Sequence, residues 1–340
     1  MAPNTRAVLL ALTAFAIFAT HDVIVKLLGA HYASFQIVFF SVLFSFPVAT
    51  LLLLRDQTAG TLIPVHPWWV ATRTAAAVIT GACAFYAFSV LPLAQTYAII
   101  FASPLLITLL SIPILGEKVG LRRGLAVIVG LLGVLIVLRP GTTTLGLGHL
   151  AALGCAVFGA LASIIVRKIG RDERSIVLIL YPLMANFVIM GALMPLVYRP
   201  MTVGHLGLSF AIAALAIIAA LCLISAYKSG EAAIVAPMQY SQILWATIFG
   251  MLFFSETPSW NTALGAAVII ASGLYIVLRE SSKAGETQAP VLRTRTRFDT
   301  GTMPRVSTII RASGEEPPMA PPREDPAPSP PHMRGLPGRG

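Results

Sequence analysis

Charged residues are scarce in this chain. Asp, Glu, Lys and Arg make up 11% of the 340 residues, well below the ~25% that is usual in a soluble domain. Hydrophobic residues account for 56%, and the mean hydropathy is +0.82. This composition excludes an ordinary soluble domain and is typical of an integral membrane protein with several spans.

Cysteines and catalytic motifs are also few. Cys83, Cys155 and Cys222 stand singly inside apolar segments, without the spacing of a disulfide framework or a metal site. The sequence contains no H-E-x-x-H, no G-x-S-x-G and no phosphate-binding G-x-x-x-x-G-K-[ST]. We therefore expect no metal, no cofactor, no enzymatic activity and no ATP drive within this chain.

Long apolar runs fill the first 280 residues. Each is close to the ~20 residues needed to cross ~30 Å of hydrocarbon, and an unpaired backbone cannot exist in lipid, so each is predicted to be a helix. The sequence thus predicts an all-α integral membrane protein with ten transmembrane helices. They span approximately 7–28, 34–54, 69–91, 94–115, 121–138, 148–166, 176–198, 206–227, 232–254 and 262–279.

The net charge of +10 comes mainly from lysines and arginines in the short connectors and the C-terminal region. We interpret them as topology signals, and expect no nucleic-acid partner. One set of connectors is strongly basic, and the N-terminal Arg6 lies on the same side. The positive-inside rule then places both termini in the cytoplasm. The predicted location is the cytoplasmic, or inner, membrane, with the lipid bilayer as a partner; the sequence leaves a homodimer open.

The chain contains an internal repeat. L-G-E at Leu115–Glu117 is followed 22 residues later by Arg139, and F-S-E at Phe254–Glu256 is followed 23 residues later by Arg279. Five helices per half is an odd number, so the second half must enter the membrane inverted, an arrangement found in secondary transporters. We predict a first five-helix repeat over 1–139 and a second over 140–280.

Beyond residue 280 the composition changes. Residues 281–340 hold eleven of the 24 prolines, in runs such as P-P-M-A-P-P. Apolar residues there are too sparse to form a core, so we expect a disordered proline-rich cytoplasmic tail.

The order of these motifs resembles that of the EamA-type drug/metabolite transporters. The likeness rests on the ten helices in two halves, L-G-E and its copy, D-V-I-V-K at Asp22–Lys26 and F-Q-I-V-F-F at Phe35–Phe40. It covers roughly residues 7–279. The resemblance implies a carrier of amino acids, nucleosides or related metabolites, with a central cavity between the halves. The second copy departs from the pattern by carrying F-S-E in place of L-G-E.

Ionisable residues at membrane depth are costly and suggest function. His21 and Asp22 lie about two-thirds along the first segment, and the aligned part of the second half, at Ala160–Ser163, has no ionisable group. We interpret His21, Asp22 and Lys26 as candidate coupling or gating residues. The alternative is structural, because Lys26 lies one turn after Asp22 on the same helix face and can neutralise it.

The ninth segment carries the densest cluster of uncharged polar residues. Amide and hydroxyl groups in lipid need partners, which either a substrate or a neighbouring helix can provide. We favour cavity lining by Gln239, Tyr240, Gln242 and Trp245. Tyr97, Ser103, Asn186 and Tyr86 are weaker substrate-binding candidates, with packing or interhelical bonding as the alternative.

Two prolines have a mechanical interpretation. Pro104 and Pro237 lie within the fourth helices of the two halves. Proline removes one backbone hydrogen bond and kinks a helix, which here frees the carbonyls of Ile100 and Ala233 to face a cavity. We predict that these kinks serve as gating points.

Together these features predict a secondary transporter that moves a small polar or amphipathic metabolite, amino-acid- or nucleoside-like, across the cytoplasmic membrane by alternating access. The alternative is a non-transporting membrane sensor or assembly partner that docks through its proline-rich tail.

Overall fold

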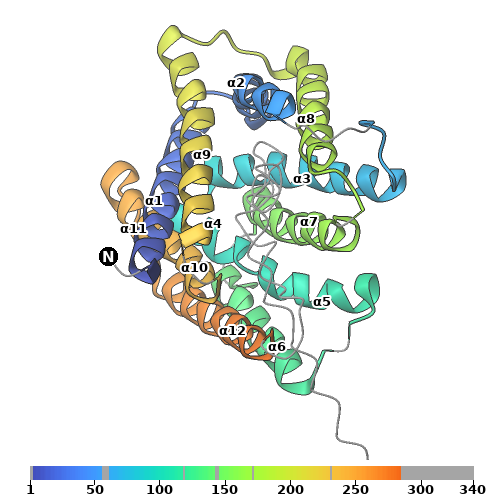
Figure 1. Ribbon diagram of the computed structural model, residues 1–340. Helices are drawn as coiled ribbons and strands as arrows, with labels where there is room; N and C mark the ends of the chain where they lie inside the picture. The colour runs from blue at the N-terminus through green and yellow to red at the C-terminus, as the bar shows by residue number, and fades with distance from the viewer. Residues whose placement is uncertain are drawn as a thin grey trace, which may run out of the picture.

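The computed structural model describes residues 3–55, 61–117, 119–141, 145–170, 172–229 and 232–284. All regular elements of these residues are helices (Figure 1). They are α1 (Pro3–Gly29), α2 (Ser34–Arg55), α3 (Pro67–Val90), α4 (Leu93–Ile100), α5 (Ser103–Leu115), α6 (Leu121–Leu138), α7 (Leu147–Ile169), α8 (Ser175–Val197), α9 (Val203–Ser229), α10 (Ala232–Val235), η1 (Ala236–Tyr240), α11 (Ser241–Phe254) and α12 (Trp260–Ala284).

The predicted helical segments coincide with these elements, with α4 and α5 together forming the fourth segment and α10, η1 and α11 the ninth. Within the described residues, seven helical stretches are long and apolar enough to cross a membrane. Two shorter apolar stretches, Ser34–Pro47 and Trp260–Ile276, belong to α2 and α12. Residues 281–284 complete α12, and the rest of the predicted tail, 285–340, lies outside the described residues.

The surface of the bundle is unusually apolar. On α6, Leu125, Ile128 and Leu132 each expose about half of their surface, and on α11 Leu244 and Leu252 expose 67% and 71%. Soluble monomers rarely present contiguous apolar patches of this kind. In a bilayer the same side chains face hydrocarbon, which makes the exposure favourable.

Helices from the two halves pack against each other throughout the bundle. The closest pairs are α1 with α9, α3 with α7, α6 with α12 and α2 with α8 (Figure 1). The largest core cluster includes buried side chains of α1, α2, α3 and α4 as well as α7, α8 and α11. Neither half therefore has a core of its own, and the centre of the molecule is the surface where the halves meet.

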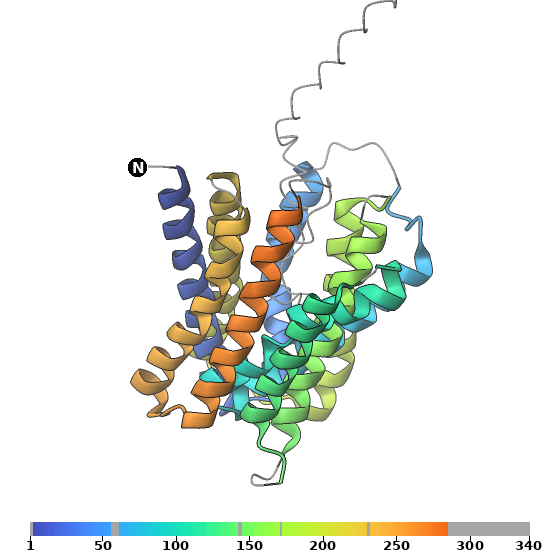
Figure 2. The same ribbon diagram turned by 90° about the horizontal axis from the view of Figure 1, so that it is seen from below.

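The two ends of the bundle are distinct. The start of α1 and the end of α12 lie at the same end, and the α6–α7 and α11–α12 connectors lie at the opposite end (Figure 2). We call these the terminal end and the far end. An even number of passages is required to return the chain to the end where it started.

Proline accompanies a break in both predicted gating helices. The helix of the first half stops at Ile100 and restarts as α5, with Pro104 in its first turn. In the second half the chain passes through the 3₁₀ turn η1, with Pro237 in its first turn. The missing amide hydrogen of proline accounts for both breaks, whereas their role in gating stays a prediction.

Small residues allow α6 and α12 to touch through their backbones. A Cβ added at Gly265 would lie 2.6 Å from the carbonyl oxygen of Gly133, and one added at Gly133 would lie 3.0 Å from that of Gly265. Close approach through glycine is how many membrane helices associate. These two glycines therefore serve as packing residues between α6 and α12.

Gly265→Ala is expected to lower stability, because the backbone oxygen of Gly133 cannot move without separating the helices. Overpacking of this kind costs about 1–3 kcal/mol. Gly207→Ala in α9 is the matched control, since nothing lies within 4 Å of its added Cβ, and alanine there should be neutral or stabilising. The measurement is the thermal unfolding midpoint in detergent; equal midpoints for the two variants would contradict the packing argument.

Candidate functional site

A buried carboxylate lies in α1. Asp22 is 1% exposed, and its neighbour His21 is 4% exposed. The His21 ring Nδ1 lies 2.7 Å from Asp22 Oδ1, and the ring meets Phe85 of α3 edge-on at 6.1 Å between centroids. Burying a carboxylate carries a large desolvation cost, so the surroundings of Asp22 must provide hydrogen bonds to it.

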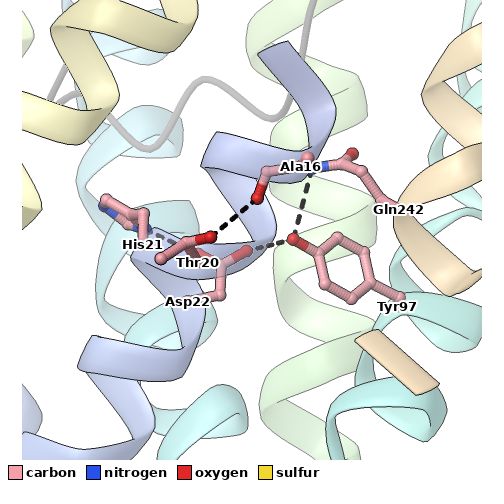
Figure 3. A network of polar contacts seen from close by, with 6 residues as sticks. All are labelled: Ala16, Thr20, His21, Asp22, Tyr97 and Gln242. Carbon is pink, nitrogen blue, oxygen red and sulfur yellow. Dashed lines mark hydrogen bonds and ion pairs between the residues drawn. The ribbon is translucent and has the colours of Figure 1, made fainter. Parts of the chain in front are cut away.

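Tyr97 supplies one of these hydrogen bonds. Its hydroxyl donates to Asp22 Oδ2, and the same hydroxyl accepts a hydrogen bond from Gln242 Nε2 at 3.2 Å (Figure 3). Tyr97 is 2% exposed and Gln242 1%. We call His21, Asp22, Tyr97 and Gln242 the central polar site. Its members come from α1, α4 and α11, so the site joins the two halves of the chain.

The central polar site lies beside both helix breaks. Tyr97 is in the last turn of α4 before the break at Phe101, and Gln242 is the second residue of α11, directly after η1. A row of aromatic rings links the two breaks, since the ring centroid of Phe101 lies 5.6 Å from that of Tyr97 and 5.3 Å from that of Tyr240. Polar groups and irregular backbone at this depth are tolerated only where protein or a cavity surrounds them.

The other predicted substrate-binding residues are spread over the bundle. Ser103 donates to the carbonyl of Ala156 in α7 at 3.0 Å, which is the interhelical bond considered as its alternative role. Asn186 is fully buried in α8 and donates to Pro182 of its own helix. Its Oδ1 has no partner among the described residues.

The remaining candidates are less buried or pack on aromatic rings. The ring of Trp245 packs near that of Phe249, with 6.0 Å between the ring centroids. Tyr240 is 6% exposed and also contacts Phe101. Gln239 and Tyr86 are half-buried, and the structure shows no hydrogen bond from either side chain within the part of the chain it describes. Of the eight candidates, Tyr97 and Gln242 therefore belong to the central polar site.

Lys26 does not pair with Asp22, so the Asp22–Lys26 ion pair considered from the sequence is wrong. Lys26 Nζ lies 2.7 Å from Glu256 Oε1, donates to the carbonyl of Leu91 and stands 5.2 Å from the centroid of the Phe254 ring. The Lys26 and Glu256 side chains are 11% and 19% exposed. The partner lies more than 200 residues away in the chain, which is why helical spacing alone pointed to Asp22.

A left-handed turn positions Glu256. Ser255 has φ 53°, and Gly116, its counterpart in L-G-E, has φ 69°. The next amide donates six residues back in both copies, Glu117 to Ser111 and Glu256 to Gly250. The F-S-E departure therefore keeps the turn, with serine in a conformation that favours glycine.

The first-half glutamate makes the corresponding contact. Glu117 pairs with Arg167 near the end of α7, and Lys168 donates to the carbonyl of Ile114 while its Nζ lies 4.3 Å from the centroid of the Trp69 ring. Each repeat glutamate thus binds a basic residue near the end of the first helix of the other half. The signal for this contact in the sequence is the repetition itself, because an acidic residue and a basic residue stand at matching places in each half.

Among the described residues, no group of three or more His, Cys, Asp or Glu side chains could hold a metal ion. The chemistry available in the central polar site is that of one carboxylate, one imidazole, one phenol and one amide. These groups can bind polar atoms and exchange protons.

A bundle of long apolar helices around a buried polar site defines a multi-pass membrane protein. The profile of the EamA-like transporter family matches residues 5–139 and 146–278 of this chain. The chain belongs to the EamA-like transporter family, and it carries the family domain twice.

Two curated relatives illustrate the family's range. The S-adenosylmethionine uptake transporter of Rickettsia bellii is 25% identical over 77% of this chain and 90% of its own length. The pseudopaline exporter CntI of Pseudomonas aeruginosa strain UCBPP-PA14 is 28% identical over 78% of this chain and 93% of its own. Both are transporters, in keeping with the prediction that this chain is not an enzyme.

The fold also has a solved counterpart. One crystal structure superposes with a TM-score of 0.51 at 21% identity, over 80% of this chain and 97% of the other. This likeness concerns the fold alone.

Proposed function

We propose that this protein is a secondary transporter of a small polar or amphipathic metabolite, amino-acid- or nucleoside-like, and that it works by alternating access in the cytoplasmic membrane. The observation that carries the proposal is the central polar site. It places a buried carboxylate between the halves of a chain whose family consists of transporters. One relative performs uptake and another export, so the direction of transport is not taken over from them.

The central polar site is suited to binding a polar substrate. Asp22 can accept from a donor group of the substrate, while Gln242 and Tyr97 offer both donors and acceptors. A network of this kind is costly in lipid unless it is fully satisfied. A substrate that replaced the Gln242–Tyr97 hydrogen bond, which is 3.2 Å long, would leave no polar group unpaired.

We further propose that residues 1–139 and 140–280 form inverted repeats and that the bundle crosses the membrane ten times, with both termini cytoplasmic. The helix pairing supports this arrangement. Exchanging the halves turns the α1–α9 contact into the α7–α3 contact, and the α6–α12 and α2–α8 contacts into themselves. The terminal end would then be cytoplasmic and the far end external.

The two glutamate ion pairs are suited to act as gates. Glu256–Lys26 joins the halves at the far end, and Glu117–Arg167 joins them near the terminal end. Alternating access requires that contacts between the halves break at one end while they hold at the other. Each pair is only partly exposed, so opening exchanges a desolvated pair for two hydrated charges, and this exchange can be close to balanced.

The proposed binding site can be tested with ligand-dependent stability. The purified protein would be screened against amino acids, nucleosides, thioethers and polyamines; a ligand at a hundredfold excess over its Kd stabilises the folded state by about 2.7 kcal/mol. Gln242→Ala is expected to remove the stabilisation by any such ligand. Thr13→Ala is the control, because Thr13 is exposed on α1 and bonds to its own helix.

A flux assay in proteoliposomes completes this test. The stabilising compound should enter liposomes that contain the wild-type protein and enter those with Gln242→Ala far more slowly. Folded protein that moved none of the metabolite pools would count against the transporter proposal. The family assignment does not favour the alternative of a non-transporting sensor that docks through its tail, and that tail lies outside the described residues.

A further inference from the structure

A cavity of about 220 Å³ lies at the far end of the bundle. It is formed where α4 begins, α6 ends and the chain passes from α11 to α12. Its lining comprises Pro92, Ala94, Gln95, Val137, Arg139, Ala246, Thr247, Gly250, Glu256, Thr257, Pro258, Ser259 and Thr262. None of the four members of the central polar site lines it. We call it the far-end cavity.

The lining of the far-end cavity combines an apolar base with polar groups. Ala94, Val137 and Ala246 are buried and provide the apolar part. Thr247, Thr257, Ser259 and Thr262 contribute hydroxyl groups. Gln95 contributes an amide, whose Nε2 lies 3.2 Å from Nε2 of the His149 ring. A cavity of this size is smaller than the ~300–1,000 Å³ of sites for drug-sized ligands, so its occupant must be small.

Two opposite charges line the same cavity. The guanidinium of Arg139 donates to Ser259 Oγ at 3.4 Å. The carboxylate of Glu256 accepts from the amide of Leu93 at 2.9 Å through Oε2 and pairs with Lys26 through Oε1. A molecule that carries both a carboxylate and an ammonium group matches these two groups, because guanidinium binds carboxylate in a forked geometry.

We propose that the far-end cavity is a recognition site for the amino and carboxylate groups of a zwitterionic α-amino acid. Arg139 and the neighbouring hydroxyls bind the carboxylate, and Glu256 binds the ammonium group. This inference deepens the proposed function and rests on it, since it makes the cavity the outer recognition site of the same transport route.

The shared glutamate gives the cavity a further property. An ammonium group bound at Glu256 competes with Lys26 for the same carboxylate. Occupation of the cavity therefore weakens the Lys26–Glu256 pair, so that a zwitterion at the far end favours opening of the gate proposed there. A carboxylic acid without an amine binds Arg139 but leaves that gate closed.

The test uses three related probes and isothermal titration calorimetry on the full-length protein in detergent. The probes are L-methionine, its methyl ester, which lacks the carboxylate, and 4-(methylthio)butanoate, which lacks the amine. L-Methionine is expected to bind more tightly than either analogue. Arg139→Gln is expected to lower the affinity for L-methionine about ten- to a hundredfold, which is the cost of losing a charge-assisted hydrogen bond. The affinity for the methyl ester should not change.

Two control variants show whether an effect of Arg139→Gln comes from the cavity or from the loss of any arginine charge. Arg199→Gln removes a charge from the connector between α8 and α9, where Arg199 bonds to the His31 carbonyl and does not line the cavity; its affinity for L-methionine should equal that of the wild type. Arg139→Lys should restore part of the affinity. The proposal is overturned by equal affinity in Arg139→Gln and wild type, by equal affinity for all three probes, or by no binding of L-methionine at millimolar concentration.

Failure of this inference can be told from failure of the proposed function. Thr13→Ala lies outside both sites and should bind L-methionine as the wild type does. Arg139-dependent binding without flux in the wild type supports the cavity and removes the transporter proposal. Flux of a stabilising ligand without Arg139-dependent binding removes the cavity and leaves the transporter proposal standing.

Discussion

Asp22→Asn is expected to lower the initial transport rate about ten- to a hundredfold while the protein still folds. Asparagine keeps the shape of the side chain and can still accept from the Tyr97 hydroxyl, but it removes the negative charge. A hydrogen bond to a charged group contributes about 1.5–3 kcal/mol, and a factor of ten corresponds to 1.4 kcal/mol. The measurement is uptake of the stabilising ligand into proteoliposomes, normalised to the amount of folded protein.

The same variant tests proton coupling. Asp22 is contacted by His21 and by the Tyr97 hydroxyl, while Lys26 one turn later is engaged with Glu256. If Asp22 carries the coupled proton, the dependence of the rate on pH should disappear in Asp22→Asn and remain in Thr13→Ala. An unchanged pH profile in Asp22→Asn would exclude coupling through this carboxylate. The same pH profile would then be measured for His21→Gln.

Reversing either charge of the Lys26–Glu256 pair is expected to abolish transport, and reversing both is expected to restore part of it. Lys26→Glu places two carboxylates together, and Glu256→Lys places two ammonium groups together. Removing one partner of a buried pair costs about 3–5 kcal/mol. This pair is partly exposed, at 11% and 19%, so its loss should cost less than that. In the double reversal the attraction returns, but the amide of Leu93 loses its acceptor, so recovery should be partial.

The double reversal separates a pair from two independent charges. Two residues that act independently would give a double variant at least as defective as either single one, and that result would falsify the gate at the far end. Glu117→Arg with Arg167→Glu provides the matched experiment near the terminal end, because that pair has the same relation to the repeat.

A chemical cross-link asks whether the pair must open during transport. The variant carries Lys26→Cys and Glu256→Cys, with Cys83, Cys155 and Cys222 replaced by serine. A bifunctional thiol reagent can then join the two introduced thiols. The joined protein should bind its ligand at the central polar site yet transport none of it. Full transport by the cross-linked protein would mean that the far end does not open at this pair.

Much of the fold was predictable from the sequence because a bilayer leaves so few options. Backbone groups in lipid must bond within their own segment, so each apolar run of about 20 residues had to be a helix. The breaks at Pro104 and Pro237 were predictable for the same local reason, the missing amide hydrogen of proline. The buried Asp22 and the polar Gln242 also stood out by composition, since such side chains are costly in lipid.

Contacts between distant residues were not predictable in this way. Helical spacing paired Lys26 with Asp22, because residues four apart share a face, yet the structure pairs Lys26 with Glu256. Tyr97 was a weak candidate by sequence, and its position between Asp22 and Gln242 depends on how α4 lies against α1 and α11.

The sequence by itself therefore determined the class, the helices, the repeat and the residues too polar to be placed in lipid without a reason. These features follow from local physical chemistry, namely the cost of unpaired backbone and of buried charge. The tertiary structure alone decided which polar groups meet: one carboxylate in the central polar site, and two glutamates in ion pairs that join the halves at opposite ends. These contacts depend on the packing of helices that are far apart in the chain, so residue spacing along a single helix cannot predict them.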